Sequence, residues 1–412
     1  MSNKSEFRLL CLSNGHGEDI VAVRILQELS QISKKLNISA LPLVGEGRAY
    51  FAADIPVIGS VQAMPSGGFL YMDGRQLVRD LQGGLLQLTY TQLKAMRTWV
   101  KDGGGKILAV GDVVPLLFAW WSSANYAFVG TAKSEYYVRD GLGNLRQNNR
   151  MANFLGLNSS IYLPWERWLM SNPRSLAVFP RDQMTAKMLQ KWRIPVFDLG
   201  NPMMDGLIPV HPLQISALAQ LSIVLLPGSR VPEVYTNWQQ ILVAIFSLLE
   251  VFSDRSLLFL GAISAQVNLE ILAQMLVKAG FCSLNNQTFT YKNASIVLSQ
   301  TAYNECLARA DIAIAMAGTA TEQFVGLGKP AIAFPGNGPQ FTYSFAEAQS
   351  RHLGSSLILL EHPNQTGEAV QTLLTDTEQL AQIAENGYKR MGKPGAARRI
   401  AECLIEQFEQ NN

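Results

Sequence analysis

Short apolar runs alternate with longer amphipathic segments along most of the chain. The first half holds runs at residues 7–12, 38–44, 107–110, 126–129, 176–179 and 195–199. A second series follows at residues 222–226, 256–260, 312–315 and 331–334. Each run has the length of one buried strand, and the segments between runs, such as residues 20–29, repeat apolar positions at helical spacing. This alternation predicts an α/β fold in which helices cover parallel sheets.

A proline-containing stretch separates the two series of predicted strands. Residues 206–216 include Pro209 and Pro212, which interrupt helix and strand alike, so we interpret the stretch as a linker. We therefore expect two doubly wound Rossmann-like domains that face each other across a cleft, at residues 1–208 and 217–380. The tail, residues 381–412, is helical in pattern, is broken at Lys393-Pro394-Gly395 and ends in an amphipathic run.

The composition excludes several classes of protein. Charged residues make up 16% of the 412 residues, against roughly 25% in an average soluble domain. The apolar share of 48% is too high for a disordered chain, and two sheets buried on both faces account for much of it. The formal net charge of +2 is too small for an electrostatic nucleic-acid binder, so we expect no nucleic-acid partner.

Cysteines and uncharged segments predict neither a disulfide framework nor a membrane span. The cysteines are widely spaced and form no CxxC pair, which favours a reducing compartment without a zinc site: Cys11, Cys282, Cys306 and Cys403. Residues 113–132 and 206–229 carry no Asp, Glu, Lys or Arg, but prolines and polar residues interrupt both before roughly 20 apolar residues accumulate. The first residues do not have the layout of a secretory signal.

A loop rich in small residues joins the first predicted strand to the first helix. Its sequence is Ser13-Asn14-Gly15-His16-Gly17-Glu18-Asp19. Such a loop lets a ligand approach the backbone, and it places a helix N-terminus at the carboxyl edge of the sheet. It does not match GxGxxG, and no acidic residue ends the second strand, so the pattern disfavours a nicotinamide cofactor.

Three side chains at this predicted edge are candidates for a general base. His16 and Asp19 lie in the loop, and Asp112 follows the strand predicted at residues 107–110. Each is able to take a proton from a substrate hydroxyl. Two have structural alternatives: Asp19 as a first-turn charge that interacts with the helix dipole, and Asp112 as an N-cap.

Two loops in the second half have the features of phosphate-binding loops. In the first, Gly228 opens the backbone, Ser229 offers a hydroxyl, and Arg230 offers a fork for phosphate oxygens. An ordinary capped helix with a solvated Arg230 is the alternative. The second loop, Gly318-Thr319-Ala320-Thr321, offers free N–H groups at a predicted helix start.

Acidic and amide side chains one turn into that helix complete the predicted nucleotide site. Glu322 or Gln323 is suited to binding a ribose diol. Neither loop contains the lysine of a Walker sequence, so the pair indicates binding rather than hydrolysis of a nucleotide phosphate.

A further loop follows the last predicted strand and has the composition of a sugar site. Residues 336–343 combine hydrogen-bonding side chains with aromatic ones, and Gln340 and Thr342 are its candidate ligands. A plain surface loop is the alternative. The sequence has no Asp-x-Asp motif suited to clamping a metal on a sugar nucleotide, so we expect Arg230 and helix dipoles to stabilise a leaving diphosphate.

One segment pairs an apolar tip with basic residues. The tip is Phe69-Leu70-Tyr71-Met72, and a helical pattern follows with Arg75 and Arg79 and, farther on, Lys94, Arg97 and Lys101. This combination is typical of a protein that rests on an anionic membrane surface without spanning it. A core-packing helix with a solvated face is the alternative.

Three motifs in order resemble those of a known family. They are similar to motifs of lipid-A-disaccharide synthase and its related proteins. In chain order they are Gly200-Asn201-Pro202-Met203-Met204-Asp205, Pro227-Gly228-Ser229-Arg230 with Glu233, and Gly318-Thr319-Ala320-Thr321. The peptidoglycan N-acetylglucosaminyltransferase is more distantly similar. The similarity is strongest over residues 176–354.

The resemblance implies a GT-B glycosyltransferase. It implies a UDP-sugar donor on the C-terminal domain, a membrane-lipid acceptor on the N-terminal domain, inversion without a metal or other cofactor, and a last helix that crosses back to the N-terminal domain. Gly228, Ser229 and Arg230 then fall on the family's phosphate loop, with Gly318, Thr319 and Thr321 on its second nucleotide loop. Asp112 falls near the catalytic aspartate.

The acceptor side departs from the family's pattern. Its candidate loop residues are Asn14, Gly15 and Gly17, in a loop whose Gly17-Glu18-Asp19 replaces the synthase's Ser-Gly-Asp, so the resemblance does not fix lipid A as the product. We expect a cytoplasmic enzyme associated peripherally with the inner face of a membrane. A non-hydrolysing UDP-sugar epimerase and a non-catalytic nucleotide-sugar-binding scaffold are the alternatives.

Overall fold

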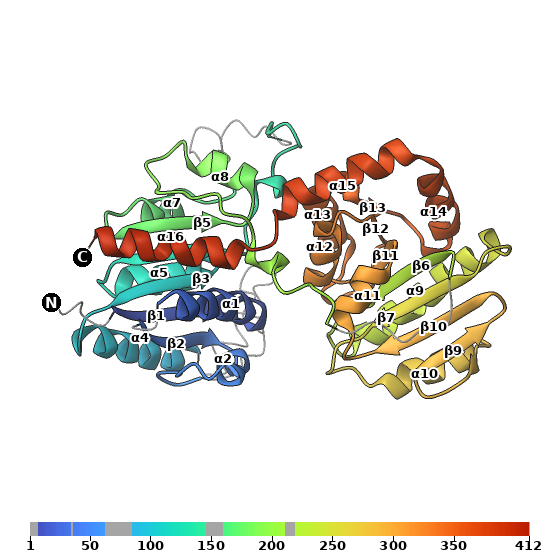
Figure 1. The fold of residues 1–412 in the computed structure, drawn as a ribbon, viewed down its shortest axis with the longest axis horizontal. Coiled ribbons are helices and arrows are strands. Elements are labelled where there is room, and N and C mark those ends of the chain that lie inside the picture. The colour runs from blue at the N-terminus through green and yellow to red at the C-terminus, as the bar shows by residue number, and fades with distance from the viewer. Residues whose placement is uncertain (1–6, 34–35, 62–84, 146–159, 211–218, 412) are drawn as a thin grey trace. The chain divides into compact units, whose positions relative to one another are not determined.

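The computed structural model describes residues 7–33, 36–61, 85–145, 160–210 and 219–411 (Figure 1). Contacts divide the chain into two compact units. Unit 1 comprises Met1–Asp205 and Lys393–Asn412, and unit 2 comprises Gly206–Gly392. The divisions fall at residues 205 and 392, whereas the sequence analysis places them at 208 and 380.

Unit 1 contains a five-stranded parallel sheet. Its order is β2 (Leu36–Val44), β1 (Phe7–Asn14), β3 (Lys106–Gly111), β4 (Tyr126–Gly130) and β5 (Ser175–Pro180). The strand predicted at residues 195–199 is wrong, because only a single parallel bridge joins Val196 to Val178. Pro195 has no N–H to donate, which limits the ladder there.

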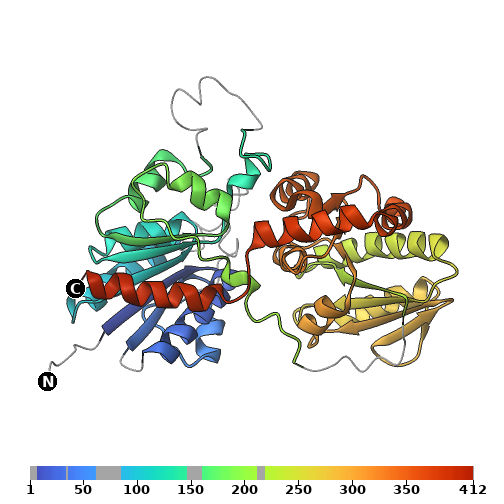
Figure 2. The ribbon, with the colours of Figure 1, turned by 45° about the horizontal axis from the view of Figure 1, so that its top comes forward.

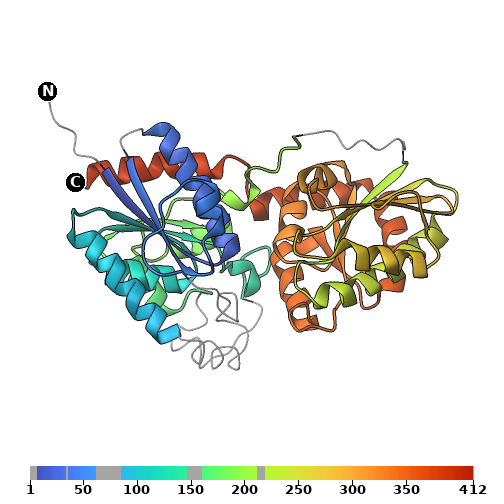
Figure 3. The same cartoon turned by 90° about the horizontal axis from the view of Figure 1, so that it is seen from below.

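Helices cover both faces of this sheet. They are α1 (His16–Ile32), α2 (Arg48–Ala52), α4 (Leu85–Lys101), α5 (Val113–Trp121), α7 (Pro164–Met170), α8 (Gln183–Leu189) and α16 (Ala396–Gln410). Alternate residues of β1 point to opposite faces. Leu9 and Cys11 pack with α1 and α16, and Leu10 and Leu12 pack with α4, α5 and α7. Figure 3 shows α16 and α4 on opposite sides of the sheet.

The last helix belongs to unit 1, as the predicted fold class requires. Figure 2 shows this helix, in red, running along unit 1. Its buried side chains recur at helical spacing and pack in the core of the sheet: Ala396, Ala397, Ile400, Ala401, Leu404 and Phe408. Asp205 accepts hydrogen bonds from the backbone N–H groups of Gly395, Ala396 and Ala397 at its start. At its end, Lys106 Nζ donates to the carbonyl oxygens of Phe408 and Asn411, both at 3.0 Å.

Unit 2 is built on an eight-stranded sheet. Its order is β13 (Leu357–Leu359), β12 (Ala331–Ala333), β11 (Ile312–Ala315), β6 (Leu221–Leu226), β7 (Leu257–Ala262), β10 (Ala294–Ser299), β9 (Thr288–Tyr291) and β8 (Cys282–Ser283). Neighbours from β13 to β10 pair in parallel, whereas β9 and β8 pair antiparallel at one edge. The strands β8, β9, β10 and β13 are not predicted by the apolar runs of the sequence.

Seven α-helices are described in unit 2. They are α9 (Glu233–Val251), α10 (Leu269–Lys278), α11 (Tyr303–Arg309), α12 (Thr319–Gly326), α13 (Tyr343–Leu353), α14 (Thr366–Thr375) and α15 (Thr377–Met391). The helices α10 and α14 contact α9, and α15 contacts α12 and α13. A hydrogen bond of 3.2 Å from Tyr388 to the Leu327 carbonyl helps tie α15 to α12, which places residues 381–392 in unit 2.

Both sheets follow the predicted doubly wound plan, and the prediction of an α/β chain with two Rossmann-like domains is confirmed. Within the described ranges, none of the helices carries a run long and apolar enough to cross a bilayer.

Candidate functional site

The carboxyl edge of the unit 1 sheet brings Asn14 and Asp112 together. They end adjacent parallel strands, and Asn14 Nδ2 donates to Asp112 Oδ1 at 3.1 Å. The backbone N–H of Val114 donates to the same oxygen at 2.8 Å, so Asp112 also caps α5. Its Oδ2 accepts no hydrogen bond from the residues that the structure describes. Asp112 therefore fills its structural role with one oxygen and has a second available for chemistry.

Electrostatics at this edge favour protonated carboxyl groups. Burial raises the pKa of Asp112 above its ordinary value, although the bonds from Val114 and Asn14 and the charge of Lys133 lower it in part. Glu18 shows the larger change: burial, together with the charges of Asp112 and Asp19, raises its pKa to about 7. A carboxylate with a raised pKa is a stronger base once it has lost its proton.

Glu18 is a functional candidate that the sequence analysis missed. It is the third residue of α1, and its Oε1 lies 3.4 Å from the hydroxyl of Thr131, the residue after β4. The feature of the sequence that points to Glu18 is its position between Gly17 and Asp19 in the first loop. The electrostatic interaction between Glu18 and Asp112 arises because β1 and β3 end at the same edge, and the sequence alone does not give the distance between the two carboxyl groups.

Asp19 lies in a separate buried network. It is 2% exposed and accepts a hydrogen bond of 2.5 Å from Ser13 Oγ, which in turn accepts one of 2.6 Å from Tyr50. Burial raises the pKa of Asp19 to about 6. Because the partner of Asp19 is Ser13 on β1, its hydrogen bond stabilises the loop between β1 and α1.

The remaining loop candidates stand at the start of α1. His16 is its first residue, and its side chain lies outside the described part of the structure. Gly15 precedes it with a φ of +129°, a conformation that favours glycine. Gly17 is exposed, with open space where a side chain would stand. The loop is thus open to solvent at Gly17.

A buried ion pair supports the neighbouring loop after β4. Lys133 Nζ lies 2.6 Å from a carboxylate oxygen of Glu166 on α7, with both side chains largely buried. The aromatic ring of Tyr162 lies 5.6 Å from the same ammonium group. This pair fixes the positive charge that acts on Asp112.

In unit 2, the loop after β6 is shaped by Gly228. Its φ of +92° is left-handed, and a Cβ at this position would lie 3.1 Å from the carbonyl oxygen of Met316. Glycine is therefore needed both for the turn and for the close approach of the loop after β11. Ser229 and Arg230 follow and are exposed.

The loop after β11, predicted to bind a nucleotide, exposes fewer side chains than expected. Gly318 is the N-cap of α12 and Thr319 is exposed. Thr321 is fully buried, and its hydroxyl donates to the Ala317 carbonyl at 2.5 Å. The loop's exposed contribution is its backbone and Thr319.

The two candidates for the ribose contact are both largely buried. Gln323 Oε1 accepts a hydrogen bond of 2.6 Å from Tyr303, and a carboxylate oxygen of Glu322 lies 3.7 Å from Nε2 of His352. In this structure both side chains are engaged with other helices of unit 2.

The loop after β12 carries the predicted sugar ligands. Thr342 caps α13 by accepting a hydrogen bond of 3.3 Å from the Phe345 N–H, and Gln340 is half-buried. Because β12, β11 and β6 are adjacent parallel strands, their three loops meet at one edge of the sheet. The structure thus assembles Gly228–Arg230, Gly318–Thr319 and Gln340–Thr342 into one candidate anion and sugar site.

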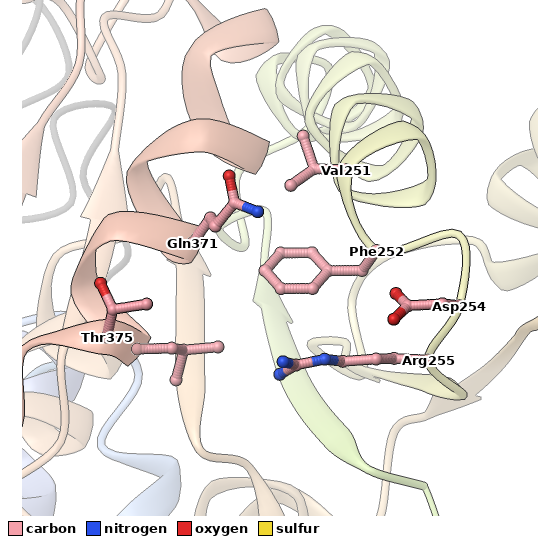
Figure 4. Close-up of a pocket in the computed structure, with 7 residues that line it drawn as sticks. Val251, Phe252, Asp254, Arg255, Gln371 and Thr375 are labelled. Carbon is pink, nitrogen blue, oxygen red and sulfur yellow. The ribbon is translucent and has the colours of Figure 1, made fainter.

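A hollow elsewhere on unit 2 does not belong to this site. Its volume is about 180 Å³, and it lies at the C-terminal ends of α9 and α14, with Phe252, Arg255 and Gln371 among its lining residues (Figure 4). Helix C-termini carry partial negative charge, which disfavours a diphosphate. None of the predicted donor residues lines it.

The predicted membrane-docking segment cannot be placed on the structure. The membrane-docking residues lie outside the described residues: Phe69, Leu70, Tyr71, Met72, Arg75 and Arg79. In the part of the chain that is described, no three His, Cys, Asp or Glu side chains are arranged to hold a metal ion.

Comparison with known proteins supports the resemblance seen in the sequence. The sequence model of the lipid-A-disaccharide synthetase family matches residues 175–333, which include the loops after β6 and β11. The resemblance to that family is therefore confirmed over these residues. No curated protein sequence shows significant similarity to the chain.

Solved structures share the fold at low identity. A putative UDP-N-acetylglucosamine 2-epimerase from Listeria monocytogenes has a TM-score of 0.61 at 14% identity, covering 99% of this chain and 98% of its own. The Acinetobacter baumannii MurG has 0.56 at 11%, covering 97% and 99%. The calicheamicin glycosyltransferase CalG4 has 0.59 at 14%, covering 98% and 99%. At such identities the likeness shows the two-domain fold of these proteins.

Proposed function

We propose that the chain is an inverting, metal-independent glycosyltransferase that moves a sugar from a UDP-sugar to a membrane-lipid acceptor. The match of residues 175–333 to the lipid-A-disaccharide synthetase family supports a transferase with a UDP-sugar donor. The observation that carries the proposal is the meeting of the Gly228 and Gly318 loops at one edge of unit 2.

The donor's diphosphate fits these loops by charge. The N-terminus of α12 carries partial positive charge, and Arg230 adds a full charge from the exposed neighbouring loop. Both act most strongly on the departing UDP, where negative charge grows as the glycosidic bond breaks.

Asp112 is the proposed proton acceptor on unit 1. As the acceptor hydroxyl oxygen bonds to the anomeric carbon, its proton passes to Asp112 Oδ2, and UDP leaves with the electrons of the broken bond. One such displacement inverts the anomeric carbon. The single oxygen committed to Asn14 and Val114 holds Asp112 in place during the transfer.

Exposed tryptophans on unit 1 support a membrane-facing acceptor. Trp165 and Trp168 on α7 are 47% and 54% exposed, and the Trp168 ring packs edge-on against Trp120 at 5.3 Å. The exposed Lys191 and Arg193 flank Trp192, whose ring lies over Arg167 of the same helix α7. Amphipathic rings beside basic residues are suited to the headgroup region of an anionic membrane. We place the enzyme at the cytoplasmic face of such a membrane.

Incubation with labelled UDP-sugars and a lipid extract, followed by mass spectrometry of the lipids, tests the proposal. Transfer to a lipid is expected, and Arg230→Ala is expected to reduce it by roughly 10²-fold. Intact UDP binding with no transfer from any donor would contradict the transferase proposal.

An epimerase is the second candidate, because the Listeria structure shares the fold. It would convert UDP-N-acetylglucosamine in plain buffer without lipid, so the same assay without the extract separates the two. Binding of UDP-sugars with neither reaction would instead favour a non-catalytic scaffold.

A further inference from the structure

Glu233 holds the loop after β12 through two backbone hydrogen bonds. It is the first residue of α9, is 6% exposed, and follows the Gly228–Arg230 loop after Val231 and Pro232. Its Oε1 accepts from the N–H of Gln340 at 3.1 Å and from the N–H of Phe341 at 2.6 Å. A buried carboxylate that accepts two backbone bonds is a strong anchor, since charged acceptors form stronger hydrogen bonds than neutral ones.

The anchored loop has little freedom to settle elsewhere. Phe341 is 4% exposed, and its ring packs against Phe345 at 5.3 Å. A side chain at Gly336 would collide with the Phe341 carbonyl and would lie 3.2 Å from Asn237 Oδ1. The loop therefore folds back so that Gly336 lies against Phe341, and Glu233 holds it at Gln340 and Phe341.

The phosphate loops keep anchors of their own. Asn237, one turn after Glu233 on α9, donates from Nδ2 to the Pro227 carbonyl at 3.0 Å. Gln349 on α13 donates from Nε2 to the carbonyls of Ala317 and Gly318 at 3.0 and 3.1 Å. Removal of the Glu233 carboxylate would thus release the loop after β12 without releasing the other two.

We propose that Glu233 is a positioning residue that sets the sugar-binding loop, Gly336–Thr342, against the diphosphate loop that precedes Glu233 in the chain. It acts through the backbone of Gln340 and Phe341 and touches no substrate. The inference rests on the proposed function, because it takes the sugar half of a UDP-sugar as the ligand of this loop. Its consequence is that recognition of the sugar depends on Glu233 and recognition of UDP does not.

Two substitutions at this position separate positioning from charge. Glu233→Ala removes both hydrogen bonds, whereas Glu233→Gln keeps an acceptor oxygen and loses the charge that also acts on Arg230. With UDP-N-acetylglucosamine as the probe in calorimetry, Glu233→Ala is expected to weaken binding by about tenfold, while UDP binds within about twofold of wild type. Glu233→Gln is expected to stay close to wild type with both ligands.

The matched control is Glu270→Ala. Glu270 also stands in the first turn of a unit 2 helix, α10, but it is exposed. It is expected to bind both ligands as wild type does. An equal loss of UDP and UDP-sugar binding in Glu233→Ala, or equal damage from Ala and Gln, would overturn the positioning role.

Hydrogen–deuterium exchange of the ligand-free protein supplies a readout that needs no donor. Glu233→Ala is expected to speed exchange in peptides covering residues 336–342 and to leave those covering 316–323 unchanged. Unchanged exchange over 336–342 would overturn the inference. A wild-type chain that binds neither UDP nor UDP-sugar would contradict the proposed function, while the exchange result would still decide whether Glu233 holds the loop.

Discussion

Asn14 and Asp112 are 98 residues apart in the sequence, yet the amide of one donates to the carboxylate of the other at 3.1 Å. Their contact follows from β1 and β3 being parallel neighbours. It orients Asp112 while leaving its second oxygen unused by the described residues, which is the arrangement expected of a positioned base.

Replacement of Asp112 by Asn tests that role. Asparagine is also a good N-cap, so the fold is expected to persist, while transfer falls by about 10²- to 10⁴-fold with UDP-sugar binding retained. Steady-state rates and calorimetry measure the two effects. Asp376→Asn, which alters the N-cap of α15, is the control and is expected to leave the rate unchanged. Normal transfer by Asp112→Asn would exclude it as the base.

The raised pKa of Glu18 predicts a pH-dependent cost in stability. The folded state holds a proton on Glu18 up to about pH 7, whereas an unfolded chain releases it near its ordinary value of 4.5. The folded state therefore binds more protons between these values, and stability falls as the pH rises through this window. Glu18→Gln is expected to raise stability above pH 7 by on the order of 2 kcal/mol, and to change it little below pH 4.5.

Thermal unfolding at pH 4.5 and pH 8 measures this difference. Glu46→Gln is the control, since Glu46 is an exposed residue of the same unit. An equal effect of Glu18→Gln at both pH values would show that its carboxyl group is not desolvated.

The tryptophan pair on α7 predicts membrane binding that depends on aromatic side chains. Trp165→Ser combined with Trp168→Ser is expected to reduce co-sedimentation with anionic vesicles at least about tenfold, because both rings would lose their place among the headgroups. Tyr343→Ser, which removes an aromatic side chain 62% exposed on unit 2, is the control. Equal sedimentation of all three proteins would remove α7 from the membrane-facing surface.

Lys106 is expected to stabilise the end of α16, 302 to 305 residues away in the sequence. Lys106→Met removes two charge-assisted hydrogen bonds to the end of α16, and we expect a loss of about 1–3 kcal/mol. Proteolysis within α16 should become faster, as gel analysis of timed digests would show. Lys101→Met, at the exposed end of α4, is the matched control. Wild-type resistance of Lys106→Met to proteolysis would mean that apolar packing alone retains the helix.

The sequence predicted those parts of the fold whose pattern is strong. Residues 312–315 were placed without error as β11, and the break at Pro394 correctly separates α15 from α16. The antiparallel edge was not predicted. β8 has two residues, and β9 has four, held by antiparallel pairing with β8 and β10, which a local pattern does not contain.

The candidate site was predictable to the level of loops. Parallel strands must end at one edge, so the residues after them gather there. The directions of side chains were not predictable. The hydroxyl of Thr321 could have faced a ligand or the backbone, and in the structure it donates a hydrogen bond to the Ala317 carbonyl. Glu233 entered the sequence analysis only as part of a motif, because its partners lie 107 and 108 residues away.

The membership of α16 in unit 1 has a consequence for biosynthesis. A ribosome makes β1–β5 first, then the whole of unit 2, and only afterwards the helix whose Ile400, Leu404 and Phe408 cover one face of the first sheet. Unit 2 is continuous in sequence and has all its elements while that face is covered only in part, by α1 and α2. Of the two units, unit 1 is thus begun first and completed last, and its partly covered sheet is open to aggregation or chaperone capture until α16 has been made.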